Sequence, residues 1–291
     1  MVALPAVDIR RAVRMGLEED LAQGDTTAAL FSEPTPARAK IIAQQPLVVA
    51  GMAAAIQTFI AVDASLKLTP SRQDGSHAKN GDILLQIEGD GRSILMAERV
   101  ALNFLQYLSG IATLTNHFCR AVHGYPVDIM DTRKTLPGWR AIQKWAVSLG
   151  GGTNHRVSLG DGILIKDNHL ALIKSKKQAV LTACKIARAT ASKDKPVIVE
   201  VESLSEVQAA LHGKAEIILL DNMTPSAVKQ AVKLIDGRAL VEVSGGITLK
   251  NVRAMAAAGP DRISIGALTH SAPAATLSLV LEPRRKPRRA S

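Results

Sequence analysis

The sequence predicts an α/β protein with a small antiparallel N-terminal domain followed by an incomplete α/β barrel. Short strand patterns and turn residues fill the first part of the chain. After residue 126, six apolar strand-like runs alternate with helical segments, which is typical of parallel βα units. Polar residues or glycine follow almost every run. This favours a barrel with one shared mouth over an open sheet, whose polar residues would gather at its switch point.

The N-terminal elements are short and separated by turn signals. Asn80-Gly81 and Gly89-Asp90-Gly91 predict tight turns, because asparagine and glycine tolerate positive φ. A helix over 94–122, with leucines near one stripe and a candidate kink at Ser109-Gly110, should connect the two halves. The remaining expected elements are strands at 37–43, 47–50, 66–68 and 83–87 and a helix at 53–62.

The second half is more regular. The expected strands lie at 127–130, 163–165, 197–199, 217–220, 240–243 and 263–265, and the expected helices at 179–191, 204–211, 225–235 and 249–258. About 140 residues hold these units, fewer than an eightfold barrel needs. The barrel is therefore expected to be short or incomplete.

The composition indicates an ordinary soluble protein. The 291 residues are 47% hydrophobic and 21% charged. The longest apolar stretch, around residues 46–60, is shorter than the roughly 20 residues that cross a bilayer. With no secretory signal visible, a cytoplasmic location without membrane contact is expected. The two cysteines have no CxxC or Cys/His spacing, which argues against a disulfide framework and a structural zinc site.

The net charge of +10 raises the question of nucleic-acid binding. Half of the excess comes from Arg284, Arg285, Lys286, Arg288 and Arg289, in a tail over 284–291 that we expect to be disordered. Aromatic residues make up only 3% of the chain, and no nucleic-acid-reading module is recognisable. No nucleic-acid partner is therefore expected.

Three cation-rich clusters, DTRKTLPG, GGGTNHR and LIKDNH, lie between Asp131 and His169. They contain almost no neutralising acid, and two of them follow strand-like runs, where a merely solvated basic face is less expected. Guanidinium groups bind planar oxyanions bidentately, and lysine acts as a point charge for phosphate. The cations predict a pocket for a polyanion. They are Arg133, Lys134, His155, Arg156, Lys166 and His169.

Carboxylates and glycines end the later strands. Glu200 and Asp221 could bind Mg²⁺, hydrogen-bond sugar hydroxyls or stabilise a positively charged transition state, and structural pairing with lysine stays open. Ser244-Gly245-Gly246, placed before a helix expected near Leu249, predicts a phosphate cradle, together with Gly266 at the next strand end. Chemistry on a sugar phosphate fits this inventory better than acyl transfer.

At these residues the sequence closely resembles the quinolinate phosphoribosyltransferase family. DTRKT, GGGxNHR and LIKDNH, in this order and spacing, are the most specific motifs. Others that match are EEDLAQGDTT, AERVALNFLQYLSGIAT, GDGILIKDNH, VEVES, ILLDN, SGGIT and IGALTHS. The resemblance covers nearly the whole chain and stops before the tail.

The resemblance implies phosphoribosyl transfer from phosphoribosyl pyrophosphate to quinolinate with decarboxylation, in de novo NAD biosynthesis. It implies an open-faced α/β sandwich over 1–108, on which 271–283 packs back, and an incomplete barrel over 109–270. It also implies a homodimer whose active sites borrow residues across the interface, with Mg²⁺ as cofactor.

By motif position, the resemblance implies a role for each site residue. Arg133, His155, Arg156 and Lys166 would hold the quinolinate carboxylates, with Arg99 reaching them from the partner subunit. Lys134 and Lys166 would face pyrophosphate and substrate, Glu200 and Asp221 the ribose hydroxyls and Mg²⁺, and Ser244, Gly245, Gly246 and Gly266 the 5′-phosphate. Thr132, Asn168 and His169 complete the substrate-binding set, and Lys134, Lys166, Glu200 and Asp221 form the catalytic set. The sequence departs slightly from the usual pattern of the family at Trp139, Trp145 and EVSGG. These departures remove no charged group and bear only on the shape of the pocket.

Two alternatives remain open. A relative on the same scaffold could use another acceptor, such as the molybdenum-transport-associated homologue or a nicotinate-using transferase. A non-catalytic anion-binding or nucleic-acid-associated protein is the second, suggested by the basic tail.

Overall fold

The computed structural model describes residues 3–31, 33–173, 178–190, 192 and 195–283. The chain forms two compact units. Unit 1 contains residues 1–116, 135–151 and 271–291, and unit 2 contains 117–134 and 152–270. The predicted boundary at 108 falls inside one long helix, and the predicted disordered tail lies outside the described residues. In the described part of the chain, no helix combines the length and apolarity needed to cross a bilayer.

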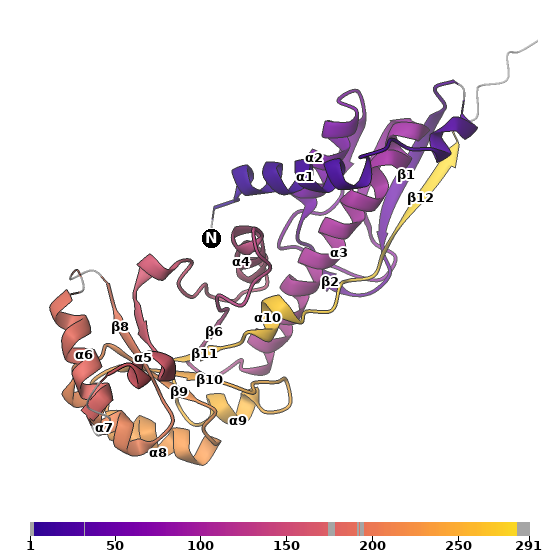
Figure 1. Ribbon diagram of the computed structural model, residues 1–291. Helices are drawn as coiled ribbons and strands as arrows, with labels where there is room; N and C mark the ends of the chain where they lie inside the picture. The colour runs from indigo at the N-terminus through magenta and orange to yellow at the C-terminus, as the bar shows by residue number, and fades with distance from the viewer. Residues whose placement is uncertain (1–2, 32, 174–177, 191, 193–194, 284–291) are drawn as a thin grey trace, which may run out of the picture. The chain divides into compact units, whose positions relative to one another are not determined.

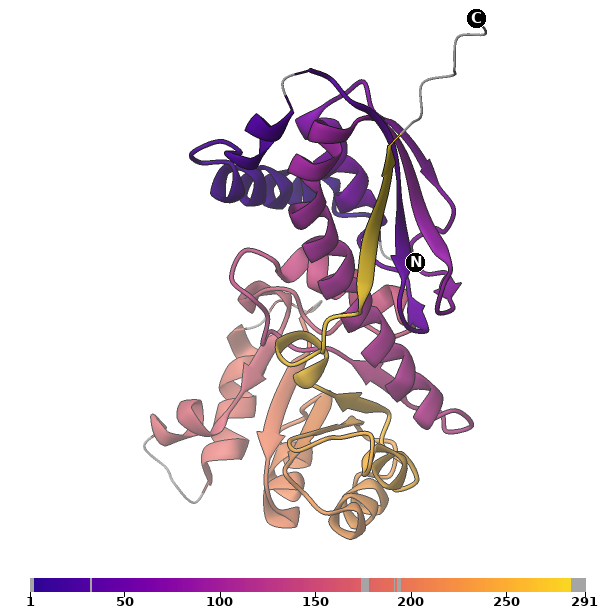
Figure 2. The ribbon, with the colours of Figure 1, turned by 90° about the vertical axis from the view of Figure 1, so that its right-hand side faces the viewer.

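Unit 1 is built on an antiparallel sheet of four strands in the order β12-β1-β5-β3. The strands are β1 (Pro36–Ala43), β3 (Lys67–Pro70), β5 (Ile83–Asp90) and β12 (Leu277–Pro283). Strand β12 comes from the end of the described chain and pairs with β1 from Ala37↔Pro283 to Ala43↔Leu277. Figures 1 and 2 show the yellow β12 lying along the indigo β1. The segment after residue 270 thus completes the sheet of the N-terminal unit.

The other elements of unit 1 are α1 (Ala6–Asp20), the 3-10 turn η1 (Thr27–Leu30), α2 (Met52–Val62), α3 (Gly91–Ala121), which runs on into unit 2, α4 (Arg140–Leu149) and the paired short strands β2 (Leu47–Val48) and β4 (His77–Ala78). Of these helices, α2 and α3 share one buried core with the sheet. Alternate residues of β1 point inward and meet buried side chains of α2 and α3, such as Phe59 and Ile94. Burial of these apolar side chains stabilises the unit.

The long helix α3 is continuous through Ser109 and Gly110. Leu102, Leu105 and Leu108 are buried as expected, whereas Leu95 is 39% exposed. The segment Gly89-Asp90-Gly91, where a tight turn was expected, forms no separate turn, because β5 runs to Asp90 and α3 begins at Gly91. Asn80-Gly81 does form a turn, with φ +87° at Gly81.

Gly110 lets the returning chain approach α3, and Gly110→Ala is expected to destabilise the protein. A Cβ at this position would lie 2.1 Å from the carbonyl oxygen of Pro273. Alanine favours a helix interior over glycine by about 1 kcal/mol, but overpacking against backbone costs about 1–3 kcal/mol or more, so the clash prevails. Thermal unfolding should show a lower midpoint for Gly110→Ala than for Asn103→Ala, an exposed control on the same helix. A rise in the midpoint of Gly110→Ala would contradict this packing.

Unit 2 contains a six-stranded parallel sheet in the order β6-β11-β10-β9-β8-β7. The strands are β6 (Asp128–Met130), β7 (Ile163–Ile165), β8 (Val197–Val201), β9 (Ile217–Asp221), β10 (Leu240–Ser244) and β11 (Arg262–Ser264). From β7 to β11, strands that follow each other along the chain lie side by side in the sheet, and β6 pairs with β11. This is the cyclic order of an α/β barrel interrupted between β6 and β7, where the described residues contain no pairing.

The helices of unit 2 follow its strands. They are η2 (Leu159–Asp161), α5 (Asp167–Ala171), α6 (Ala179–Thr190), α7 (Leu204–His212), α8 (Pro225–Ile235), α9 (Val252–Ala256) and α10 (Ala267–His270). Figure 1 shows α6, α7 and α8 side by side along the strands. Ser203 caps α7 by accepting from the Glu206 amide, and Thr224 caps α8 before a proline at the first helical position. The α/β class predicted from the sequence is confirmed.

Candidate active site

A pocket of about 390 Å³ opens where the strands of unit 2 end. In parallel βα units, this edge of the sheet is where loops collect functional side chains. The lining contains nine of the residues predicted from the sequence, namely Thr132, Arg133, Lys134, His155, Arg156, Lys166, Glu200, Asp221 and Ser244. It also contains four residues that were not predicted, namely Leu164, Leu219, Glu242 and Ser264.

Asp131 joins the first two cation clusters. It follows β6 and is fully buried. Its carboxylate accepts hydrogen bonds from the Nδ2 of Asn154 at 2.7 Å and from the backbone N–H of His155 at 2.8 Å. A buried carboxylate with two donors holds its neighbours rigidly. Asp131 thereby places DTRK beside the residues that follow the glycine run.

Arg133 and Arg156 give the pocket its positive charge. The guanidinium of Arg156 donates from Nη1 to the carbonyl of Gly162 at 3.1 Å. Burial, and after it the charge of Arg133, lowers the pKa of Arg156, whereas Asp161 and Glu242 act in the opposite direction. Two guanidinium groups close enough to repel each other provide strong attraction for an anion placed between them.

Lys166 and Glu200 form an ion pair within the lining of the pocket. Lys166 follows β7 and Glu200 lies on the neighbouring β8, so the parallel register brings the two side chains together. On the same neighbouring strands, Ile198, Ile217 and Leu219 form a small apolar cluster, and Leu164 packs against it. The sequence left open whether Glu200 pairs with a lysine. The structure shows that it pairs with Lys166 and also lines the pocket.

Asp221 ends β9 and faces the same pocket. Its Oδ2 accepts from the Nδ2 of Asn222 at 2.6 Å. Asn222 itself adopts a left-handed conformation with φ +54°. The turn after β9 therefore holds the side chains of Asp221 and Asn222, the polar residues of the ILLDN motif, against each other. The other carboxylate oxygen of Asp221, Oδ1, can accept from a ligand.

Ser244 is the last residue of β10, and Gly245 and Gly246 follow it in left-handed conformations, with φ +89° and +60°. The helix expected near Leu249 is shorter than predicted and starts at Val252, because the segment before it turns around Asn251. Asn251 accepts from the Thr248 amide and donates to the Gly246 carbonyl. Any phosphate cradle here would thus depend on the glycine turn and not on an immediately following helix.

Close backbone approach explains two of the site glycines. A Cβ on Gly245 would lie 2.2 Å from the Oδ1 of Asn222. A Cβ on Gly266 would lie 2.9 Å from the Cδ of Lys134 and 3.1 Å from the Nε2 of His270. Gly266 therefore lies next to Lys134, which lines the pocket, and Gly245 lies next to Asn222, the neighbour of the lining residue Asp221.

Other predicted site residues do not line the pocket. Asn168 and His169 lie in the first turn of α5, where the Nδ1 of His169 accepts from the Lys166 amide at 3.0 Å. Arg99 is exposed on α3 in unit 1, whereas the pocket belongs to unit 2. Gly245, Gly246 and Gly266 also fall outside the lining.

Glu242 is the charged pocket residue that sequence reasoning missed. It lies on β10 between Val241 and Val243 and is fully buried. An acid inside an apolar run that is buried as a parallel strand was the available signal, since an unpaired buried charge is costly. Ser264, on β11, contacts Glu242 and carried no comparable signal.

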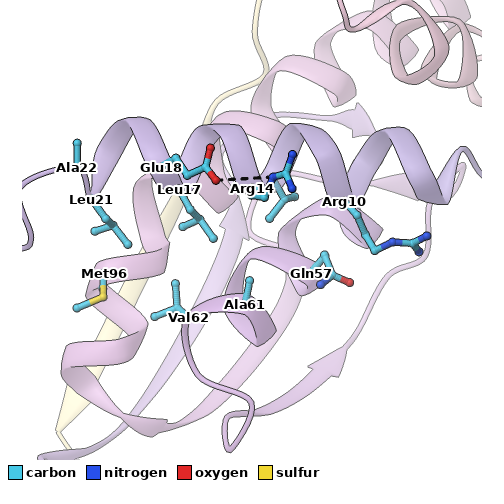
Figure 3. A pocket seen from close by; sticks show the side chains of 11 residues that line it. Arg10, Arg14, Leu17, Glu18, Leu21, Ala22, Gln57, Ala61, Val62 and Met96 are labelled. Atoms are coloured by element: carbon cyan, nitrogen blue, oxygen red, sulfur yellow. Dashed lines mark ion pairs between the residues drawn. The ribbon is translucent and has the colours of Figure 1, made fainter.

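A second pocket, of about 680 Å³, lies in unit 1 among α1, α2 and α3. Figure 3 shows its lining, which is largely apolar, with Leu17, Leu21 and Met96, and includes an Arg14–Glu18 pair at 3.7 Å. None of the predicted site residues lines it. The pocket of unit 2 is therefore the candidate active site.

Comparisons with known proteins point to one family. The quinolinate phosphoribosyl transferase C-terminal domain model matches residues 111–280, and the N-terminal domain model matches residues 25–109. The chain is 38% identical over 262 residues to a Bacillus subtilis protein named probable nicotinate-nucleotide pyrophosphorylase (carboxylating), covering 90% of this chain and 89% of that one.

A Mycobacterium leprae protein named nicotinate-nucleotide pyrophosphorylase (carboxylating) is 41% identical over 270 residues, covering 90% of this chain and 93% of the relative. The solved structure of the nicotinate-nucleotide pyrophosphorylase from Francisella tularensis superposes with a TM-score of 0.89 at 38% identity, covering 96% and 98% of the two chains. The resemblance seen in the motifs is confirmed: this chain belongs to the quinolinate phosphoribosyltransferase family.

Proposed function

We propose that this protein is a pentosyltransferase that moves the phosphoribosyl group of phosphoribosyl pyrophosphate to the ring nitrogen of quinolinate. The products are nicotinate mononucleotide, pyrophosphate and carbon dioxide, a step of NAD biosynthesis. The observation that carries this proposal is the pocket of unit 2, whose lining combines Arg133, Arg156 and Lys166 with the carboxylates Glu200 and Asp221. All of its residues lie within the segment that the C-terminal domain model of the family matches, residues 111–280.

The cations divide between the two substrates. Arg133, Arg156 and Lys166, with His155, would hold the two carboxylates of quinolinate, because guanidinium forks match planar oxyanions. Lys134, and Lys166 in a second contact, would face the pyrophosphate. Thr132 accepts from the Lys134 amide at 3.0 Å and so shapes the turn that carries this lysine.

The phosphoribosyl group would lie between β8 and β11. Glu200 and Asp221 are suited to accept hydrogen bonds from the ribose hydroxyls. The glycine turn after Ser244, together with Gly266, would receive the 5′-phosphate, since left-handed glycines expose backbone amides to anions. Asn168 and His169 would stabilise the turn that presents Lys166.

Mg²⁺ fits the donor set of this pocket. Glu200 and Asp221 provide hard carboxylate oxygens, and within the described residues no group of three or more acids, histidines or cysteines could hold a metal alone. Magnesium is commonly held by one or two carboxylates together with substrate phosphates, as this set would require. When bound, the ion would neutralise charge that develops on the leaving pyrophosphate.

Electrostatics explain the reaction. Loss of pyrophosphate leaves an oxocarbenium-like ribose, which Glu200 and Asp221 stabilise while Lys134 and Lys166 stabilise the leaving group. The quinolinate nitrogen then forms the new bond to the anomeric carbon and becomes a pyridinium. This ring takes up the electron pair of the breaking bond to the adjacent carboxylate, which leaves as carbon dioxide. A proton then replaces the lost carboxylate on the ring.

The proposed enzyme works as a homodimer in the cytoplasm, with Arg99 of each chain completing the site of its partner. Support comes from the exposure of Arg99 on α3 and from its absence from the lining of its own unit-2 pocket. Its expected task is to add one more cation to the acceptor's carboxylates. No nucleic-acid or membrane partner is proposed.

Incubation of the purified protein with phosphoribosyl pyrophosphate, Mg²⁺ and one acid at a time tests the acceptor. Quinolinate is expected to give nicotinate mononucleotide and carbon dioxide, while nicotinate gives at least about 100-fold less product, because a pocket cation left without its carboxylate partner costs about 2–3 kcal/mol. Mononucleotide is measured by chromatography and carbon dioxide by release of label from the adjacent carboxylate. Turnover of nicotinate but not of quinolinate would establish the rival transferase.

A further inference from the structure

Glu242 is a buried carboxylate at the centre of the sheet of unit 2. Its side chain has no exposed surface, and its strand pairs with β9 on one side and β11 on the other. An ionised carboxylate in such a place costs several kcal/mol unless hydrogen bonds and opposite charges compensate for it. The contacts of Glu242 therefore indicate what it does.

One oxygen of Glu242 is strongly engaged, and the other is not. Oε1 accepts a hydrogen bond from the hydroxyl of Ser264 and lies 3.2 Å from the Nε2 of His155. Oε2 is buried, and no hydrogen-bond donor of the described residues reaches it. The carboxylate is thus held on one side by Ser264 and directs that same oxygen at the imidazole.

The imidazole of His155 is fixed from both sides. Its Nδ1 accepts from the backbone N–H of Arg156 at 2.7 Å. Because a backbone N–H can only donate, Nδ1 must present its lone pair, and the ring proton is on Nε2. The Nε2–H then donates to Glu242. The side chain of His155 is only 9% exposed, so little solvent competes for these contacts.

The same contacts reach Arg156. Glu242 holds the ring, and the ring accepts from the amide of the arginine that follows it. Glu242 also opposes the lowering of the Arg156 pKa by burial and by the charge of Arg133. The carboxylate is therefore coupled to Arg156 both through the ring and through its charge.

We propose that Glu242 is a positioning residue for the acceptor's carboxylates. It fixes the Nε2–H tautomer and the ring plane of His155 and, through the Nδ1 of that ring, the backbone of Arg156. Glu242 acts through these two residues and needs no contact with the reacting atoms. This inference rests on the proposed function for its effect on quinolinate, but the tautomer itself is a property of the free protein.

Three substitutions separate hydrogen bonding from charge. Glu242→Leu removes the acceptor and is expected to raise the KM for quinolinate about tenfold, with the KM for phosphoribosyl pyrophosphate and kcat changed far less. Glu242→Gln keeps an oxygen acceptor for His155 and Ser264 and is expected to restore most of the quinolinate KM. Ser264→Ala removes one of the two contacts of Oε1 and should give a smaller rise. If Gln and Leu raise KM equally, only the charge matters and the positioning role is wrong.

A double-mutant cycle tests whether Glu242 acts through His155. In an His155→Ala background, Glu242→Leu should change the quinolinate KM by less than about twofold, because residues that act through one another are not additive. Independent, multiplied effects would contradict the proposal. Thermal unfolding of each variant shows whether the compared proteins are folded.

Nitrogen NMR of the wild-type protein, labelled on histidine and without substrate, tests the tautomer directly. The resonances of His155, assigned by their loss in His155→Ala, should show Nε2 protonated and Nδ1 unprotonated. The opposite tautomer, or a charged ring at neutral pH, would overturn the inference whether or not quinolinate is the substrate. A wild-type protein with the expected tautomer that does not turn over quinolinate would overturn the proposed function alone.

Discussion

A mixed dimer of an Arg99→Ala chain and an Arg133→Ala chain is expected to have about half the activity of the wild-type dimer, because one of its two sites is intact. Each variant alone should lose about 100-fold or more in kcat/KM, since removing one partner of a buried charge contact costs about 2–5 kcal/mol. The physical reason is that each proposed site takes residues from both chains of the dimer. Arg133 lines the pocket of unit 2, and the partner chain's own α3 would supply Arg99.

The measurement uses two affinity tags on co-expressed chains, so that only mixed dimers are purified and assayed. An Arg133→Ala chain paired with a Lys166→Ala chain is the matched control. Both residues line the same pocket, so every site of that mixed dimer lacks one of them and no recovery is expected. Equal recovery in the two pairings, or none in the first, would refute a site shared through Arg99.

The second large effect is expected for Gly245→Ala, which should reduce kcat/KM for phosphoribosyl pyrophosphate by about 100-fold, because misplacement by about 1 Å at a site has effects of this size. The added Cβ would meet the Oδ1 of Asn222 at 2.2 Å and its backbone nitrogen at 2.8 Å. Since Asn222 also donates to Asp221, the displacement would spread to the carboxylate of the pocket. Steady-state kinetics with varied phosphoribosyl pyrophosphate measures this loss.

Gly246→Ala provides the control for backbone strain. Gly246 has φ +60°, also left-handed, but a Cβ there would meet no atom within 4 Å. Alanine in the left-handed region costs about 1–2 kcal/mol, a cost that both variants share. Gly245→Ala should therefore lose more activity and have a lower unfolding midpoint than Gly246→Ala. Equal losses would show that backbone conformation, and not the approach to Asn222, explains the need for glycine.

Much of the fold was predictable because its strands are regular. Patterns such as 163–165 and 217–220 predicted β7 and β9 to within a residue, since buried parallel strands are continuous apolar runs. Helix α4 was not predicted, although Arg140, Gln143, Lys144 and Ser148 share one helical face. Gln143 and Lys144 on that polar face are nevertheless buried, which residue type alone does not indicate. Helix α1 buries only Ile9, Ala12 and Val13, too few to form a clear stripe.

The candidate site also contains residues that local sequence patterns predict and residues that they do not. Arg133, Lys166, Glu200 and Asp221 could be predicted because each stands near an expected strand end, where functional side chains of parallel βα units collect. Arg156 could be predicted from its place in the cation cluster GGGTNHR. Glu242 could not be assigned a role, because its meaning depends on His155 and Ser264, which are far from it along the chain. The helix expected after Gly246 was placed too early, since the turn around Asn251 involves side-chain hydrogen bonds that residue patterns do not show.

By itself, the sequence determined the α/β class, the family and the set of charged groups at the strand ends, because these depend on residue types in local order. Only the tertiary structure decided which of those groups share a pocket: strand pairing brings Lys166 to Glu200, and Asp131 holds the backbone of His155. It also decided how the segment expected to pack back on the first domain does so, namely by pairing of β12 with β1. Burial and hydrogen bonding between distant segments are properties of the folded chain, and they give Glu242 its partners.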